Sequence, residues 1–380
     1  DSISLADLNI EKLYFSRPFL NQWTSNKMDP GLDKFFSVLG VLICIVGSVG
    51  NLSVLLAFLV QRRLRTKVNG LLVSLVVSGL LLTGISMPLE VELHIRSEFI
   101  HGLVTCELIY TTHLIALTSS SLNLLVISIY RYLTIAYPFF MNRVSQNHIA
   151  LTITVVWLYS GITSFLPLMG WRSVPTSISR NFCNFSLEVE YILFVMSVNW
   201  LLPAMLVFVF YGLIFRIARI QAIKILEHQV LAEYERVRSP LIKGAKTLAK
   251  IAAVYIICWF PYVINVMITN SLGRHLLPYE VHYTFVFLCY ASAAINPILY
   301  GWFRNDFREM FSKSTARACS WLREVFQGLV RSFRRIIASL YGDGRESSWQ
   351  KKEGGYRSHR RRSASGSSSA YQLQTAATVV

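Results

Sequence analysis

The stretch LLVISIYRYLTIAYP, residues 124–138, decides the fold because it closes a run of apolar and hydroxyl side chains long enough to cross a lipid bilayer. Its one cation, Arg131, stands between Tyr130 and Tyr132 with no acid beside it. A charge deep in a bilayer is costly, so an arginine is expected near the end of a span, where water is close. The stretch therefore predicts the end of a transmembrane helix.

Further runs of the same kind lie along the chain. Hydrophobic residues make up 53% and charged residues 15% of the 380 residues, with a mean hydropathy of +0.45, which fits soluble proteins poorly. The predicted spans are 35–60, 68–89, 103–130, 149–171, 191–215, 251–273 and 281–303. Each is long enough for a hydrocarbon core of roughly 30 Å. Because seven such runs would be very unusual in a soluble protein, an all-α bundle of seven transmembrane helices is predicted.

Lysine and arginine are distributed unevenly over the loops. The loops 61–67, 131–147 and 216–250 hold fourteen basic residues, and the loops 90–102, 172–190 and 274–280 hold four. The positive-inside rule places the first set in the cytoplasm and the N-terminal segment 1–34 outside the cell. The tail from residue 304 is then cytoplasmic, and it carries fifteen more basic residues of a chain whose net charge is +16. We expect a multi-pass plasma-membrane protein whose partner is anionic inner-leaflet lipid and not nucleic acid.

Two of the six cysteines are predicted on the oxidising side near the membrane face. Cys106 lies at the outer end of the third span, and Cys183 lies in the loop after the fourth. We expect these two to form a disulfide. No signal-peptide pattern is visible, and the sequence opens on Asp1 in place of Met, which leaves the native N-terminus open.

Several spans contain polar or helix-breaking residues, which are costly in lipid and therefore informative. They are Gly50-Asn51, Trp157, Pro203 with Tyr211, the sequence CWFP at 258–261 and the sequence NPILY at 296–300. Each proline bends its helix and frees a backbone carbonyl, which a neighbouring amide, hydroxyl or indole can satisfy. Taken singly, each motif also fits a packing role alone.

Together, in this order, the motifs resemble those of rhodopsin-like, class A G-protein-coupled receptors over about residues 35–312. Phe303 and Phe307 match the family's short amphipathic eighth helix, here 304–312. The resemblance implies a receptor that transmits an extracellular signal to heterotrimeric G proteins by outward movement of the sixth helix. The stretches 166–171 and 212–220 also resemble an orphan receptor of primary cilia that restrains hedgehog signalling.

The resemblance implies a set of signalling-switch residues, and the chain departs from the family at two related positions. The set is Tyr130, Arg131, Tyr132, Tyr211, Trp259, Pro261, Asn296, Pro297 and Tyr300. Tyr130 replaces the acid that usually precedes the arginine, and the position of a second acid on the sixth span falls near Leu241. Gly79 replaces the acid of the second span, so Asn51, Ser120 and Asn296 should bind sodium poorly.

These departures weaken the restraint on the resting state, whereas Tyr211 and Tyr300, which receive the released arginine in the family, are present. A modest loss on the resting side shifts a two-state equilibrium visibly. We therefore predict high ligand-independent signalling. The alternative is an uncoupled decoy or scaffold receptor.

The resemblance also places a ligand pocket among the outer halves of the spans. Its predicted lining is Glu90, His113, Leu117, Thr118, Trp259, Tyr262 and Tyr290. His113 stands where amine receptors of this family keep an aspartate, which disfavours a small monoamine. Glu90 could act as a substitute counter-ion, or lie solvated near the lipid headgroups. No lysine lies between residues 276 and 303, so a retinal Schiff base is excluded.

Other classes of protein find less support in the sequence. No metal-ligand spacing, glycine-rich phosphate loop or nucleophile-elbow pattern occurs, so we expect neither an enzyme nor a cofactor or metal site. A secondary transporter remains as a third interpretation, but no inverted repeat is visible and seven spans do not divide into equal halves.

The cytoplasmic tail continues with a basic amphipathic helix, predicted over 313–341. It fits anionic lipid, or a groove-binding partner such as calmodulin or a kinase-anchoring protein. Cys319, just before it, is a candidate for palmitoylation. Residues 342–380 lack apolar periodicity and are predicted to be disordered, and the final TAATVV fits a PDZ-domain ligand.

Overall fold

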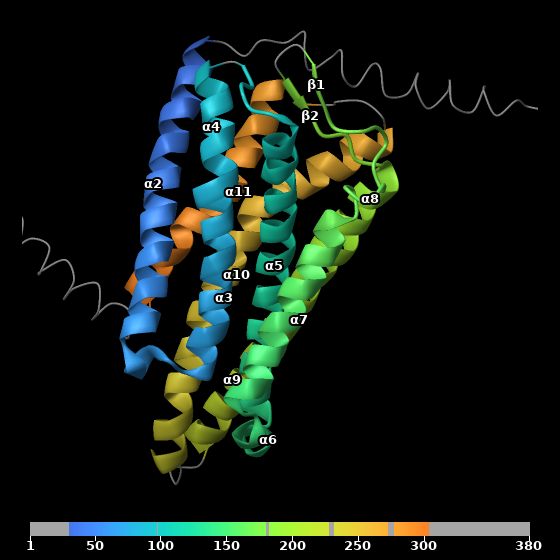
Figure 1. Ribbon diagram of the computed structural model, residues 1–380. Helices are drawn as coiled ribbons and strands as arrows, with labels where there is room; N and C mark the ends of the chain where they lie inside the picture. The colour runs from blue at the N-terminus through green and yellow to red at the C-terminus, as the bar shows by residue number, and fades with distance from the viewer. Residues whose placement is uncertain (1–29, 97, 180–181, 228–231, 273–276, 304–380) are drawn as a thin grey trace, which may run out of the picture. The chain divides into compact units, whose positions relative to one another are not determined.

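The structure is a computed structural model that describes residues 30–96, 98–179, 182–227, 232–272 and 277–303. Seven of its helices are long and apolar enough to cross a membrane, which confirms the predicted fold class. They are α2 (Pro30–Val60), α3 (Lys67–Leu81) continued by α4 (Met87–Arg96), α5 (Leu103–Ala136), α7 (Gln146–Phe165), α8 (Val189–Phe194) continued by α9 (Leu202–Glu227), α10 (Ala232–Leu272) and α11 (Tyr279–Phe303). Figure 1 shows them side by side as a bundle.

Two of these membrane helices contain a π-helical turn. The turn η2 (Leu82–Ser86) joins α3 to α4, and the turn η3 (Val195–Leu201) joins α8 to α9. An i→i+5 turn inserts extra chain into an α-helix and so changes which side chains face inward after it. Both turns lie next to predicted pocket residues, because Glu90 follows η2 and Asn199 of η3 reaches Thr118 of α5.

The helix ends differ from the predicted span ends. The helix α5 runs on to Ala136, and α10 begins at Ala232, well before the predicted start at 251. Hydropathy registers only the length that lies in lipid, whereas a helix continues as long as its backbone hydrogen bonds do. The helix α7 instead ends at Phe165, before the predicted end at 171, and a turn follows. Because α5 and α10 both continue past the predicted span ends as helices, Arg131 of α5 and Gly244 of α10 come into contact.

Small residues let α2 approach its neighbours closely. A Cβ added at Gly47 would lie 2.6 Å from Cγ2 of Thr83, and one added at Gly50 would lie 2.9 Å from Cβ of Pro297. Helix pairs in membranes associate through such close backbone contact. The helix α7, in contrast, has a stripe of exposed apolar side chains at helical spacing, as expected for a surface that faces lipid. The stripe comprises Leu151, Val155, Leu158 and Ile162.

The two ends of the bundle carry different short elements. An antiparallel hairpin, β1 (Ser177–Ser179) with β2 (Phe182–Asn184), lies at one end, and the short helix α6 (Pro138–Arg143) lies at the other (Figure 1). A single turn, η1 (Arg62–Leu64), follows α2. The predicted eighth helix 304–312, the tail segments 313–341 and 342–380, Cys319 and most of the segment 1–34 lie outside the described residues.

Candidate functional site

The predicted disulfide is confirmed at the hairpin end of the bundle. Cys106, in the first turns of α5, is bonded to Cys183 of β2, with the two Cα atoms 5.7 Å apart. The same region is held by an ion pair between Arg172 and Glu107, with N and O atoms 3.0 Å apart. These contacts fix the hairpin to the outer end of α5, over the predicted ligand pocket.

Removing this disulfide is expected to destabilise the receptor. The bond spans 77 residues of sequence, and loss of a native disulfide commonly costs about 2–5 kcal/mol. We expect Cys183→Ser to lower the thermal unfolding temperature of the purified protein and its surface expression. Cys44→Ser, at a free and half-buried thiol of α2, is the control and should leave both unchanged. Equal unfolding temperatures for wild type and Cys183→Ser would contradict the expectation.

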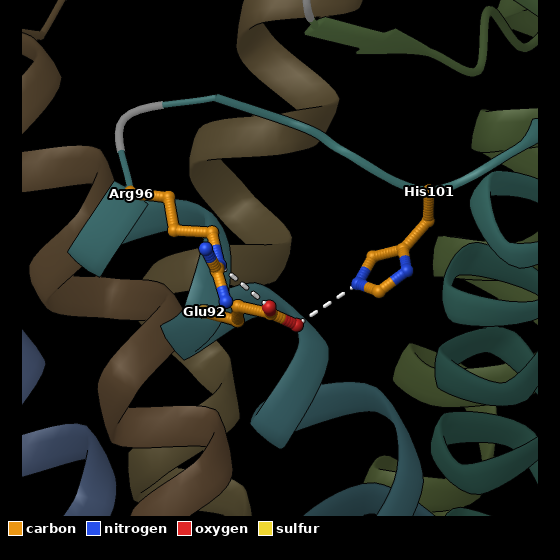
Figure 2. A network of polar contacts seen from close by, with 3 residues as sticks. All are labelled: Glu92, Arg96 and His101. Atoms are coloured by element: carbon orange, nitrogen blue, oxygen red, sulfur yellow. Dashed lines mark hydrogen bonds and ion pairs between the residues drawn. The ribbon is translucent and has the colours of Figure 1, made fainter.

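A polar network joins α4 to the loop that precedes α5 (Figure 2). Glu92 accepts a hydrogen bond from Nε of Arg96 at 2.7 Å, and its second oxygen lies 2.9 Å from Nε2 of His101. Both oxygens of this carboxylate are therefore engaged. These contacts hold the loop between the second and third membrane helices against the end of α4.

The predicted pocket residues gather around His113 of α5. Its ring centroid lies 5.6 Å from that of Trp259, 6.2 Å from that of Tyr262 and 5.7 Å from that of Tyr290. The atom Nε2 of His113 is buried and has no hydrogen-bond partner among the residues that the structure describes. The helices α5, α10 and α11 thus place three aromatic rings around a buried imidazole whose Nε2 has no described partner.

Glu90 belongs to this cluster, and its contact with Tyr290 favours the inward alternative from the sequence. The hydroxyl of Tyr290 donates a hydrogen bond to Oε2 of Glu90 at 2.6 Å. Tyr290 is itself buried, with 1% of its surface exposed. The π turn η2 lies just before α4 and interrupts the regular helical period ahead of Glu90.

Three of the predicted pocket residues, Trp259, Leu117 and Thr118, take part in hydrogen bonds between helices. Nε1 of Trp259 donates to Oγ of Ser292 at 3.0 Å, and the hydroxyl of Tyr255 donates to the carbonyl of Leu117 at 3.2 Å. Thr118 accepts from the amide of Asn199 at 3.4 Å. Three of these residues were not predicted from the sequence: Ser292, Tyr255 and Asn199. Serine and tyrosine within a span give no distinctive signal, but the asparagine, as a polar residue in lipid, could have been singled out.

Asn51 meets the proline of the seventh membrane helix. Its Nδ2 donates to the carbonyl of Ala293 at 3.0 Å, and Ala293 is the residue four before Pro297. Pro297 has no N–H, so this carbonyl would otherwise lack its helical partner. The same Nδ2 donates to Gly47 at 2.8 Å. The predicted amide rescue of a freed carbonyl is confirmed here.

The sodium site that the family fold implies does not fit the residues present. A Cβ at Gly79 would lie 3.1 to 3.3 Å from the side-chain amide of Asn51, so the amide fills the space beside the missing carboxylate. Asn51 Oδ1 is buried without a partner among the described residues, and it is neutral. A hard cation prefers anionic oxygen ligands, so this set offers no adequate site.

The opposite end of the bundle holds Arg131, which is buried in α5. Its guanidinium packs on Gly244 of α10, where an added Cβ would lie 3.5 Å from Nη2. Tyr130 is half-buried, Tyr211 and Tyr300 are buried, and the ring of Tyr132 lies 5.6 Å from that of Phe210. Gly244 was not predicted from the sequence, since a glycine in a long helix gives no signal for a contact with a distant arginine.

Comparison with known proteins identifies the family. The "7 transmembrane receptor (rhodopsin family)" profile matches residues 50–300. The human histamine H2 receptor is 31% identical over 277 residues, covering 71% of this chain and 76% of the human protein. The zebrafish (Danio rerio) G-protein coupled receptor 161 is 28% identical over 314 residues, covering 75% of this chain and 60% of its own length. The human alpha-1A adrenergic receptor is 26% identical over 317 residues, covering 74% of this chain and 67% of the human protein.

These relatives are receptors, so the chain is a receptor and not an enzyme. Seven apolar helices together with this kinship make it a multi-pass protein of the plasma membrane. The resemblance of 166–171 and 212–220 to a ciliary receptor stays a prediction. The matched profile, the confirmed disulfide and the seven-helix bundle agree with the motifs in the sequence, and the chain belongs to the rhodopsin-like, class A family of G-protein-coupled receptors.

Proposed function

We propose that this receptor activates a heterotrimeric G protein by outward movement of α10, and that it does so substantially without ligand. The observation that carries the proposal is the type of residue at two positions next to Arg131, namely 130 and 244. Tyr130 precedes the arginine in place of an acid, and the guanidinium rests on Gly244, which has no side chain with which to hold it. A charge-assisted pair between α5 and α10 would favour the closed arrangement of these helices, and neither residue can supply its anion.

The residues of the active side support the same proposal. Tyr211 on α9 and Tyr300 on α11 are both buried within the bundle. Their hydroxyls can accept hydrogen bonds from a guanidinium that leaves α10. A shift of about 1.4 kcal/mol between two states changes their ratio tenfold, so the loss of one charged contact is sufficient for visible basal activity.

The exposed side chains of helix α6, which follows Arg131 in the chain, support a docking surface for the G protein. Phe139 is 88% exposed and Phe140 is 58% exposed, although both are large apolar side chains. They lie in the loop that the positive-inside rule places in the cytoplasm. Exposed aromatic side chains are frequent energetic centres of protein interfaces.

Truncating one of them is expected to weaken coupling. We expect Phe139→Ala to lower G-protein activation about five- to thirtyfold, because a central aromatic contact commonly contributes about 1–2 kcal/mol. Nucleotide exchange on purified G protein with receptor in nanodiscs measures this. Val155→Ala, on the lipid-facing stripe of α7, is the matched control. Unchanged exchange by Phe139→Ala would indicate that α6 contacts lipid headgroups instead.

The rival candidate is an uncoupled decoy, in which the same departures at Tyr130 and Gly79 abolish coupling. Basal second-messenger level measured against receptor expression, without any ligand, separates the two. A level that rises in proportion to expression supports the proposed receptor. A flat response, with receptor present at the cell surface, supports the decoy.

A further inference from the structure

A carboxylate from the second membrane helix reaches the ligand pocket. Glu90 of α4 accepts the hydroxyl proton of Tyr290 of α11, with an O–O distance of 2.6 Å. This length is that of a well-formed hydrogen bond between two oxygens, about 2.5–3.0 Å. The contact holds the side chain toward α11, and so toward the centre of the bundle.

The carboxylate is incompletely satisfied. Tyr290 is its one hydrogen-bond donor among the described residues, and no lysine or arginine of that part of the chain forms an ion pair with it. An acid inside a membrane bundle normally has a cationic or multiply hydrogen-bonding partner, because an unpaired charge in such surroundings is costly. An ionised Glu90 therefore lacks a cation.

The surrounding side chains suit an organic cation. The ring centroids of Tyr290, Trp259 and Tyr262 all lie within 6.2 Å of that of His113, so the four rings form one cluster. Aromatic faces attract ammonium groups at about 6 Å or less from the ring. Nε2 of His113 is a further buried polar atom without a described partner, and it can bond a second polar group of the ligand.

We propose that the pocket binds a small aromatic amine whose ammonium pairs with Glu90 on α4, in place of the aspartate that His113 replaces on α5. The inference rests on the proposed receptor function and names the ligand class of that site. It reverses the expectation from the sequence that a monoamine is disfavoured, because the missing counter-ion is supplied from a different helix.

Binding of paired amines tests the proposal. Phenethylamine, tryptamine and histamine are each compared with the neutral N-acetyl derivative, using the thermal stabilisation of purified full-length receptor. We expect at least one amine to bind and its N-acetyl derivative to bind about tenfold more weakly or not at all, since one charged contact is lost. Glu90→Gln should weaken the amine by a similar factor, while its amide oxygen still accepts from Tyr290.

The neighbouring acid provides a matched control. Glu92 lies on the same helix, but both of its oxygens are engaged by Arg96 and His101 (Figure 2), so Glu92→Gln should not change amine affinity. The double variant Glu90→Gln with His113→Asp moves the carboxylate to α5, beside the same aromatic rings. It should restore at least part of the affinity, which a purely structural role for Glu90 would not allow.

The outcomes are distinct from those of the proposed function. Failure of all three amines, or equal affinity in wild type and Glu90→Gln, overturns the amine proposal and leaves Glu90 and Tyr290 as a structural pair. Basal nucleotide exchange, measured on the same preparations, reports the receptor function independently. Exchange that persists while no amine binds would remove the ligand class and keep the receptor.

Discussion

Replacing Tyr130 with aspartate is expected to lower ligand-independent signalling about tenfold while surface expression stays unchanged. The new carboxylate would stand directly before Arg131, whose guanidinium packs against Gly244 of α10. A hydrogen bond to a charged group contributes about 1.5–3 kcal/mol when well formed, and each 1.4 kcal/mol changes an equilibrium tenfold. The resting arrangement gains this contact, whereas the active arrangement does not.

Basal second-messenger production at matched expression measures the effect. Tyr130→Asn is the control, since it has the size of aspartate and no charge, and it should leave signalling high. If wild type is silent and Tyr130→Asp creates coupling, the decoy interpretation is correct. Equal signalling by wild type, Tyr130→Asn and Tyr130→Asp would show that this position does not govern the equilibrium.

Much of the fold could be predicted because lipid imposes one strong constraint. A span must be apolar over a fixed length, so hydropathy located all seven helices. The orientation that the loop charges predict stays a prediction. The disulfide followed from the compartment of two cysteines. That the carbonyl freed by Pro297 would find a polar partner followed from the requirement that backbone groups in lipid be satisfied, although the sequence did not single out Asn51 as that partner.

The contacts within the candidate site could not be predicted in the same way, because they join residues far apart in the sequence and no local pattern indicates them. The π turn η2 interrupts the regular helical period ahead of Glu90, and a helical period does not indicate the contact of Glu90 with Tyr290. The inner half of α10 is charged and resembles a loop in hydropathy, which hid its helix and the packing of Gly244 on Arg131. Both features join segments far apart in the sequence.

Gly244→Asp is expected to lower basal signalling about tenfold by a route independent of position 130. A Cβ at this position would lie 3.5 Å from Nη2 of Arg131 and 3.7 Å from Nη1 and Cζ, which is ordinary van der Waals contact. An aspartate therefore fits without displacing the backbone, and its carboxylate, one bond farther out, can reach the guanidinium. The resulting pair would join α5 to α10 directly and oppose their separation.

Two neutral variants separate charge from shape at this position. Gly244→Ala adds only the Cβ and Gly244→Asn adds an uncharged side chain of aspartate's size, so both should retain high basal signalling. A fall with Gly244→Ala equal to that with Gly244→Asp would mean that the glycine matters for space alone. Combined with Tyr130→Asp, the aspartate at 244 should add less than its separate effect, because both carboxylates compete for one guanidinium. Full additivity would mean that the two introduced acids do not share Arg131 and act by separate routes.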